Sequence, residues 1–297
     1  MPGHLAIRSI TTACSLVGAA ALLTGCGTKE AARTTTVQPL RTPSFTQAAV
    51  SSNWAGYVAR RAAGNGFDRA AGRFRVPRIS CAQGTGSSAA FWVGIGGWTA
   101  RSPSLQQLGA SADCSPTGVA AYRLWTEIVP APPTFLSLRV GPGDLIEASV
   151  AVAKGAVSFT LRNLTRHGRY AVTVRPKGKL DLGTAEWIAE APSICRTIDV
   201  CQVVTLSDFG RVAFTSVSAG SGDRIGPLGS PDWRVTPVAL VTSSGSSRYI
   251  ASSNSFGAAP GATSVGGRAF TIDYRPSLGG TVPPRPLPGA PVPAWVR

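Results

Sequence analysis

Histidine, methionine and acidic residues are scarce in this chain. Its 297 residues include 2 histidines and 1 methionine, and 14 Asp and Glu stand against 29 Lys and Arg. Catalytic sites of the Ser–His–Asp or Cys–His kind need a histidine as base. Beyond the first nine residues the only histidine is His167, in the stretch "NLTRHGRY", which is typical of a hairpin turn. Both kinds of site are therefore excluded.

Several binding motifs are also missing. The chain has no GxGxxG or GxxxxGK loop, and "GIGG" at 94–97 is too short to cradle a phosphate. There is no CxxC pair, which argues against a zinc site. The basic residues are scattered as singles and pairs, so nucleic-acid binding is not expected despite a net charge of +15. Attraction to an anionic envelope or to acidic partners is the milder inference.

No apolar run is long enough to span a bilayer. The stretch 10–23 is apolar but short, and it ends in "LLTGC". Small residues before a cysteine resemble a bacterial lipobox, so we expect residues 1–25 to be a signal peptide and Cys26 to be lipidated. An ordinary secretory signal is the alternative. Either way we expect export, with the lipid placing the chain on the outer face of the cell membrane.

The remaining cysteines favour disulfides. Four lie beyond Cys26, and an even number in an exported chain favours two disulfide bonds. Cys195 and Cys201 enclose the short loop "CRTIDVC", which makes their pairing the natural one and leaves Cys81 with Cys114.

The pattern of the central part predicts an all-β, antiparallel sandwich. Residues 26–50 read as a lipidated tether, and 276–297 hold seven prolines and should be extended. Between them, 51–275 is a series of short alternating runs, such as "NWAGYVA" and "VSFTLRNL", separated by turn residues. Helical periodicity is almost absent.

Carboxylates are the remaining candidates for catalysis. Glu186 and Glu190 in "AEWIAEA" are four residues apart and share one face of a strand. A retaining glycosidase needs two carboxyl groups about 5 Å apart, whereas positions i and i+4 on a strand are separated by about 13 Å. If one of these glutamates is catalytic, we expect its partner on another strand.

The order of several short blocks resembles the glutamic peptidase (eqolisin) family of secreted acid endopeptidases, which have a bent β-sandwich fold. The resemblance covers about 52–216 and rests on "SNWAGYV" (52–58), "FWVGIGG" with "LQQLG" (91–97, 105–109), "LWTEIVP" (124–130) and "AEWIAE" with "SDFGRVAFT" (185–190, 207–215).

The resemblance implies a catalytic pair without metal or cofactor, acting on a polypeptide. Glu190 would activate water and then protonate the leaving amine, and Gln107, two positions before a glycine, would stabilise the oxyanion. A carboxylate with a pKa near its usual value of about 4.3 would still be partly ionised in mild acid. Trp54, Trp92, Glu127 and Glu186 would line the substrate groove. A monomer is expected.

Two supporting acids of the family are missing here, because Gly96 and Ser111 stand in their places. Their absence favours one alternative to an active peptidase, a catalytically silent sandwich that binds peptide or envelope polymer in the same groove. A separate alternative is a glycan hydrolase, which would need Glu190 and Glu127 about 5 Å apart without Gln107 nearby.

Overall fold

Strands make up nearly all of the regular structure. The structure is a computed structural model that describes residues 48–61, 66–84, 86–197, 200–241, 256–276 and 294–295. Its elements are β1 (Ala49–Ser51), β2 (Trp54–Arg61), β3 (Arg69–Arg75), β4 (Ser87–Gly96), β5 (Leu105–Cys114), β6 (Ala120–Val129), β7 (Thr134–Phe135), β8 (Leu145–Ala153), β9 (Ala156–Asn163), β10 (Gly168–Val174), β11 (Thr184–Glu190), β12 (Ser193–Thr197), β13 (Val200–Val203), β14 (Arg211–Ser221), β15 (Arg224–Gly226), β16 (Trp233–Val241), β17 (Phe256–Pro260), the 3₁₀ helix η2 (Val265–Gly267), β18 (Ala269–Tyr274) and β19 (Ala294–Trp295). Within these ranges no helix is long and apolar enough to cross a bilayer.

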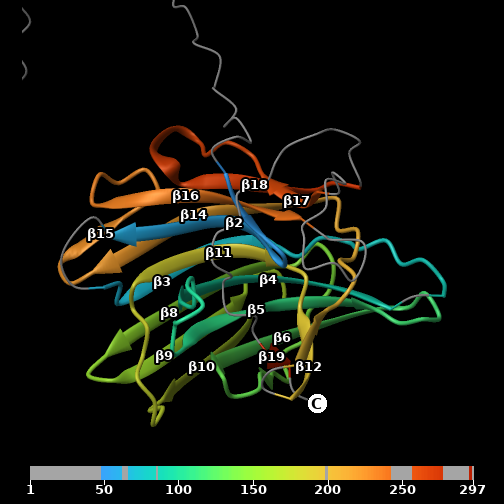
Figure 1. Cartoon of the computed structure of the whole chain (residues 1–297), viewed down its shortest axis with the longest axis horizontal. Helices are drawn as coiled ribbons and strands as arrows, with labels where there is room; N and C mark the ends of the chain where they lie inside the picture. The colour runs from blue at the N-terminus through green and yellow to red at the C-terminus, as the bar shows by residue number, and fades with distance from the viewer. Residues whose placement is uncertain are drawn as a thin grey trace, which may run out of the picture. The chain divides into compact units, whose positions relative to one another are not determined.

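One continuous sheet contains most of these strands. Its order is β10-β9-β8-β3-β14-β18-β17-β16-β2-β11-β4-β5-β6-β7, and neighbours along this path are antiparallel (Figure 1). The sheet curls so that its two halves face each other, which is the predicted antiparallel β-sandwich. The tight turn between β9 and β10 contains His167, at φ +57°, as the hairpin pattern predicted.

Alternation along the strands fills the space between the two layers. In β11 the side chains of Ala185, Trp187 and Ala189 belong to this main core, together with buried residues of β3, β8 and β14. The Trp187 indole N–H donates to the carbonyl of Ala71 across the layers at 2.8 Å. The alternate residues of β11 must therefore point away from the main core.

A second apolar cluster lies on that opposite face. It contains Trp54, Trp92, Trp98, Trp125 and Ile188, all buried. Trp54 and Trp92 meet edge to face with ring centroids 5.0 Å apart. Because Glu186 and Glu190 alternate with Trp187 and Ala189, they belong to this tryptophan-rich face.

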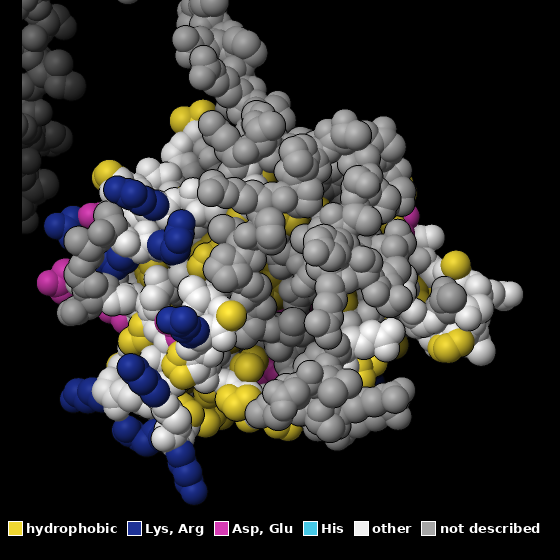
Figure 2. Space-filling model, viewed as in Figure 1, with side chains coloured by type: hydrophobic (Ala, Val, Ile, Leu, Met, Phe, Trp, Pro, Cys, Tyr) yellow, Lys and Arg dark blue, Asp and Glu magenta, His cyan; other side chains and the backbone are white. Residues whose placement is uncertain are grey.

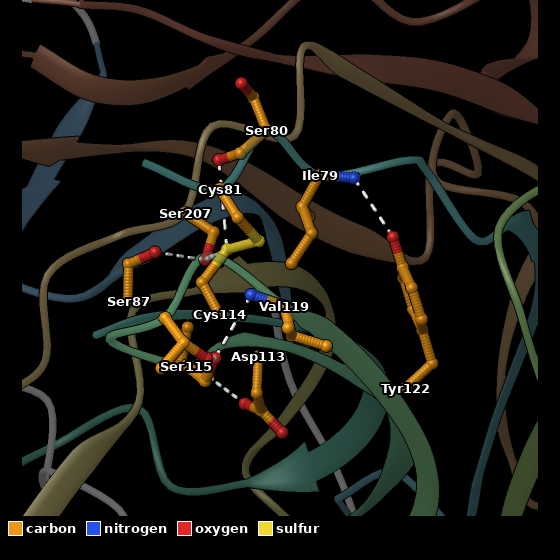
Figure 3. The surroundings of a disulfide bond; sticks show 12 residues. Ile79, Ser80, Cys81, Ser87, Asp113, Cys114, Ser115, Val119, Tyr122 and Ser207 are labelled. Carbon is orange, nitrogen blue, oxygen red and sulfur yellow. Dashed lines mark hydrogen bonds between the residues drawn. A yellow bond between two sulfur atoms is a disulfide. The ribbon is translucent and has the colours of Figure 1, made fainter. Parts of the chain in front are cut away.

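A disulfide joins Cys81, before β4, to Cys114 at the end of β5, with their Cα atoms 5.4 Å apart (Figure 3). This is the pairing that the cysteine count predicted. Cys195 and Cys201 are cross-strand partners in the backbone of β12 and β13, but their side chains lie outside the described residues.

The excess of basic residues is visible on the surface. Figure 2 shows Lys and Arg side chains gathered along one side of that view. On the exposed surface of β3 and β9, Arg73 and Arg162 both pair with Glu147, at 2.5 and 3.1 Å. Exposed ion pairs of this kind stabilise a fold by about 0–1 kcal/mol each, so they do not determine the architecture.

Candidate active site

Five neighbouring strands, β2, β11, β4, β5 and β6, bring the predicted site residues to one face. One row of cross-strand partners crosses all five strands and consists of Val58, Glu186, Gly94, Gln107 and Glu127. A parallel row joins Trp54, Glu190 and Ala90. Directly opposed residues point to the same side of a sheet. Gln107, Glu127, Glu186 and Glu190 therefore share the tryptophan-rich face, and Gln106 points to the other one.

Glu190 is held by two hydrogen-bond donors. Asn53 Nδ2 donates to its Oε1 at 3.0 Å, and Trp92 Nε1 donates to its Oε2 at 2.8 Å. The Asn53 amide is oriented by Ser51, whose hydroxyl donates to Asn53 Oδ1 at 3.2 Å. Both oxygens of the Glu190 carboxyl group thus face donors, an arrangement that favours its ionised form.

Gln107 is paired with the second carboxyl group of the site. Its Nε2 donates to Glu127 Oε2 at 2.6 Å. The other oxygen of each side chain, Gln107 Oε1 and Glu127 Oε1, has no partner among the described residues. The second N–H of the Gln107 amide likewise has no acceptor there, so it is free to donate to a bound group.

The Trp92 indole connects these two halves of the site. Gln107 lies opposite Gly94 and Glu190 lies opposite Ala90, so their positions along β4 differ by four residues. Trp92 stands between them, with Nε1 at Glu190. Its six-membered ring lies over Gly94, where a Cβ atom would be 2.8 Å from Trp92 Cζ3. The glycine thus makes room for the ring between the two partners.

Burial alters the acidity of both carboxyl groups. Burial raises the pKa of Glu190 to about 8, against hydrogen bonds from Trp92 and Asn53 that lower it. Trp54 also lowers this pKa, although its Nε1 makes no hydrogen bond of normal geometry with the described residues. Burial, followed by the charge of Glu190, raises the pKa of Glu127 to about 8. The expectation of an ordinary pKa near 4.3 for Glu190 is therefore wrong in this closed site.

Glu186 lies in the same row as Gln107 but has a different environment. Neither of its carboxyl oxygens has a hydrogen-bond partner among the described residues. Burial raises its pKa well above the usual value, and the charge of Asp181 adds to this effect. The nearby Thr184 hydroxyl lowers it, without a hydrogen bond of normal geometry. Burial and the charge of Asp181 therefore favour the protonated form of Glu186.

The residues expected to line an open groove are buried. Trp54, Trp92 and Glu186 are 0% exposed and Glu127 is 2% exposed. Trp98 covers part of this face, since its ring lies 6.3 Å from that of Trp54. The structure thus brings the predicted residues together in a buried arrangement.

Other carboxyl groups lie close to the two positions where the family's acids are missing. Gly96 has φ +84°, and a Cβ atom there would lie 2.5 Å from the Asp181 carbonyl oxygen, so this backbone admits only glycine. The Asp181 carboxylate accepts from Gly97 N at 3.1 Å and from the Ser102 hydroxyl. Ser111 donates to Asp113 at 3.2 Å. Carboxylates are therefore present at both ends of the face, supplied from other positions.

Asn53 is the site residue that sequence reasoning missed. It lies inside the block "SNWAGYV", where only Trp54 was assigned a role. An asparagine next to a buried tryptophan at the start of a strand was the available signal. Among the described residues, no cluster of three or more His, Cys, Asp and Glu side chains could hold a metal ion.

Comparisons with known proteins agree with this geometry. The sequence profile of the peptidase A4 family matches residues 52–254. A crystal structure of scytalido-glutamic peptidase with a transition state analog inhibitor is similar at 26% identity and a TM-score of 0.60, over 75% of this chain and 98% of that one.

SCP-B, described as a member of the eqolisin family in complex with the tripeptide Ala-Ile-His, shares the fold at 24% identity and a TM-score of 0.58. The match covers 75% of this chain and 98% of that one. A search of curated proteins found no match. The family match spans more than half of the sequence, and the sheet of the structure has the matching fold. The chain therefore belongs to the peptidase A4 family and is a glutamic endopeptidase, a hydrolase of peptide bonds.

Proposed function

We propose that Glu190 and Gln107 are the catalytic pair of this endopeptidase. Glu190 is the general base and later the general acid, and Gln107 is the oxyanion donor. The observation that carries the assignment is their shared face. Glu190 is held between two donors, and the Gln107 amide has one N–H with no acceptor among the described residues.

The chemistry follows from these positions. Ionised Glu190 takes a proton from a water molecule, whose oxygen attacks the peptide carbonyl carbon. The negative charge that develops on the carbonyl oxygen is stabilised by the free N–H of Gln107. Glu190 then gives its proton to the amide nitrogen as the C–N bond breaks, which leaves a carboxylic acid and an amine and returns Glu190 to its ionised form. An amide side chain does not titrate, so it can donate at any working pH.

The pKa of Glu190 determines the expected pH range. The family resemblance implied an acid peptidase, but a base whose pKa is about 8 is mostly protonated in mild acid. We therefore expect activity to rise from acid toward neutral pH. An opening movement that hydrates Glu190 would lower its pKa and extend activity toward acid.

Export and anchoring are part of the proposal. The short apolar stretch and "LLTGC" support a signal peptide with lipidation at Cys26, on the outer face of the membrane. The disulfide between Cys81 and Cys114 suits an oxidising compartment. Locating the chain in membrane and soluble fractions, with and without Cys26→Ser, tests this. A Cys26→Ser variant that fractionates like the wild type would contradict the lipid anchor.

The test of the catalytic pair is hydrolysis of an unfolded protein from pH 3 to 9. Glu190→Gln should abolish cleavage. Gln107→Ala should reduce it by about 100- to 1000-fold, the usual effect of losing an oxyanion donor. Gln106→Ala is the matched control, because the neighbouring glutamine points to the other face of β5. Its rate should stay close to that of the wild type.

Two outcomes would contradict the assignment. Cleavage by folded Glu190→Gln at the wild-type rate would show that another group is the base. A folded wild type that cleaves at no pH but binds peptide would favour the silent sandwich. A glycan hydrolase is disfavoured, because that alternative required close Glu190 and Glu127 without Gln107 nearby, and Gln107 is hydrogen-bonded to Glu127.

A further inference from the structure

The carboxyl groups of Glu190 and Glu127 have different kinds of hydrogen-bond partner. The Glu190 oxygens face Asn53 Nδ2 and Trp92 Nε1, which can only donate. A proton on Glu190 would find no acceptor in either group and would break one of these bonds. The partners therefore favour the charged form of Glu190.

Glu127 faces a group that can both donate and accept a hydrogen bond. The Gln107 amide donates through Nε2 to Glu127 Oε2 at 2.6 Å, and its Oε1 is an acceptor without a partner among the described residues. Glu127 Oε1 also has no partner there. One proton on Glu127 Oε1 would let the acid donate to Gln107 Oε1 while the existing bond is kept. An amide and a carboxylic acid then form two antiparallel hydrogen bonds, and both unpartnered oxygens are satisfied.

On this basis, and resting on the proposed function, we propose that the working site holds one proton on Glu127 and the negative charge on Glu190. Glu127 is then a positioning residue that acts through Gln107. Its O–H and Oε2 fix both ends of the Gln107 amide, so that the remaining N–H points toward the oxyanion. An ionised Glu127 would lose this second contact and would place a second negative charge next to the developing oxyanion.

Electrostatics support the same assignment. Burial raises the pKa of both groups to about 8, and the charge of Glu190 further raises that of Glu127. Two buried carboxyl groups that interact lose their protons in two steps that belong to the pair. The first proton should leave from Glu190, where donors stabilise the charge, and the second should then leave from Glu127 at higher pH.

Other charged groups on this face do not change that order. Burial raises the pKa of Glu186 on β11 well above its usual value, and the charge of Asp181 raises it further. Asp113 on β5 is paired with Arg123 on β6 at 3.0 Å. Arg60 and Arg234 stand opposite each other on β2 and β16 and are exposed. Of the charges on this face, it is Glu190 that shifts the pKa of Glu127.

The test compares Glu127→Gln with Glu127→Ala over pH 4 to 10. Wild-type activity should rise as Glu190 ionises and fall again as Glu127 ionises. Glutamine can still exchange two hydrogen bonds with Gln107 but cannot titrate, so Glu127→Gln should lose the alkaline decline. It should also be at least about tenfold more active than Glu127→Ala, which leaves the Gln107 amide without a partner. Glu186→Gln, the same substitution on the same face, should keep the alkaline decline.

The opposite results would overturn the proposal. If Glu127→Gln is as inactive as Glu127→Ala, the site needs a carboxylate at this position. If its alkaline decline persists, another group causes that decline. In either case an inactive Glu190→Gln would leave the proposed function standing.

A spectroscopic measurement covers the case in which no activity is found. The infrared difference spectrum of wild type minus Glu127→Gln at pH 7 should contain the C=O band of a protonated carboxylic acid. A carboxylate band in its place would show that Glu127 is ionised and would overturn the proposal, whatever the activity.

Discussion

Glu127 and Glu190 show how neighbours give one residue type two different states. Both are buried on the same face, and burial raises the pKa of each to about 8. Glu190 meets two N–H donors, whereas Glu127 meets an amide that offers both a donor and an acceptor. A hydrogen bond to a charged group stabilises it by roughly 1.5–3 kcal/mol. The partners, and not the burial, therefore distinguish the two carboxyl groups.

The substitution Trp92→Phe tests whether a hydrogen-bond partner controls the ionisation of Glu190. The substitution removes the Nε1 donor to Glu190 but keeps an aromatic ring. Loss of a bond of roughly 1.5–3 kcal/mol to the charged form should raise the pKa of Glu190 by about one to two units. The acid limb of kcat/KM should move to higher pH by that amount, so the rate at pH 6 should fall roughly 10- to 100-fold. Trp98→Phe, on the same face, should leave this limb in place. An unmoved limb in Trp92→Phe would show that the indole does not control Glu190.

At the scale of elements, the register of β4 decides how the site residues meet. Trp92 lies between the rows of Gln107 and Glu190, and its ring occupies the space that a side chain at position 94 would fill. Gly109 lies directly opposite Trp92 on β5, where a Cβ atom would be 2.1 Å from the Phe91 carbonyl oxygen. Two glycines thus let β4 and β5 approach each other around one indole ring.

Gly94→Ala should damage activity more than stability. The new methyl group would meet Trp92 Cζ3 at 2.8 Å and should push the ring away from its place over position 94. Overpacking of this kind costs about 1–3 kcal/mol, and a displacement of the Trp92–Glu190 contact should lower kcat/KM at least about tenfold. Gly178→Ala is the control, since no atom lies within 4 Å of its added Cβ. Kinetics and thermal unfolding of both variants check this. Wild-type kcat/KM in Gly94→Ala would contradict it.

At the scale of the whole folded unit, the sandwich buries three carboxyl groups on one face. Glu127, Glu186 and Glu190 are each 0–2% exposed, and the pKa of each is raised by burial. An acid whose pKa is higher in the folded than in the unfolded chain stabilises the fold when protonated. That contribution is complete below the unfolded pKa and is lost as pH rises through the folded pKa.

The free energy of unfolding should therefore fall between about pH 4.5, the usual pKa, and about pH 8. Each group protonated only in the folded state contributes a slope of about −1.4 kcal/mol per pH unit. Glu186→Gln removes one such group, whose oxygens have no hydrogen-bond partner among the described residues, and should make the slope shallower. Urea unfolding at several pH values measures this. Parallel slopes for the two proteins would show that Glu186 is already ionised in the folded state.

The alternation of short runs predicted the fold class, because period-two patterns require sheets with a buried face. The hairpin turn at His167 and the Cys81–Cys114 disulfide were also predictable from local sequence. Resemblance in the ordered blocks selected Gln107 over Gln106, and the structure places Gln107 on the face that carries Glu190.

The tertiary structure decided what the side chains touch. That Asn53 and Trp92 donate to Glu190, and that Glu127 pairs with Gln107, depends on the register of strands far apart in sequence. The raised pKa of Glu190 depends on burial by the whole tryptophan-rich face. The sequence alone determined which residues could do chemistry, because residue types and alternation are local properties. Only the fold determined their protonation and geometry, since both arise from contacts between distant strands.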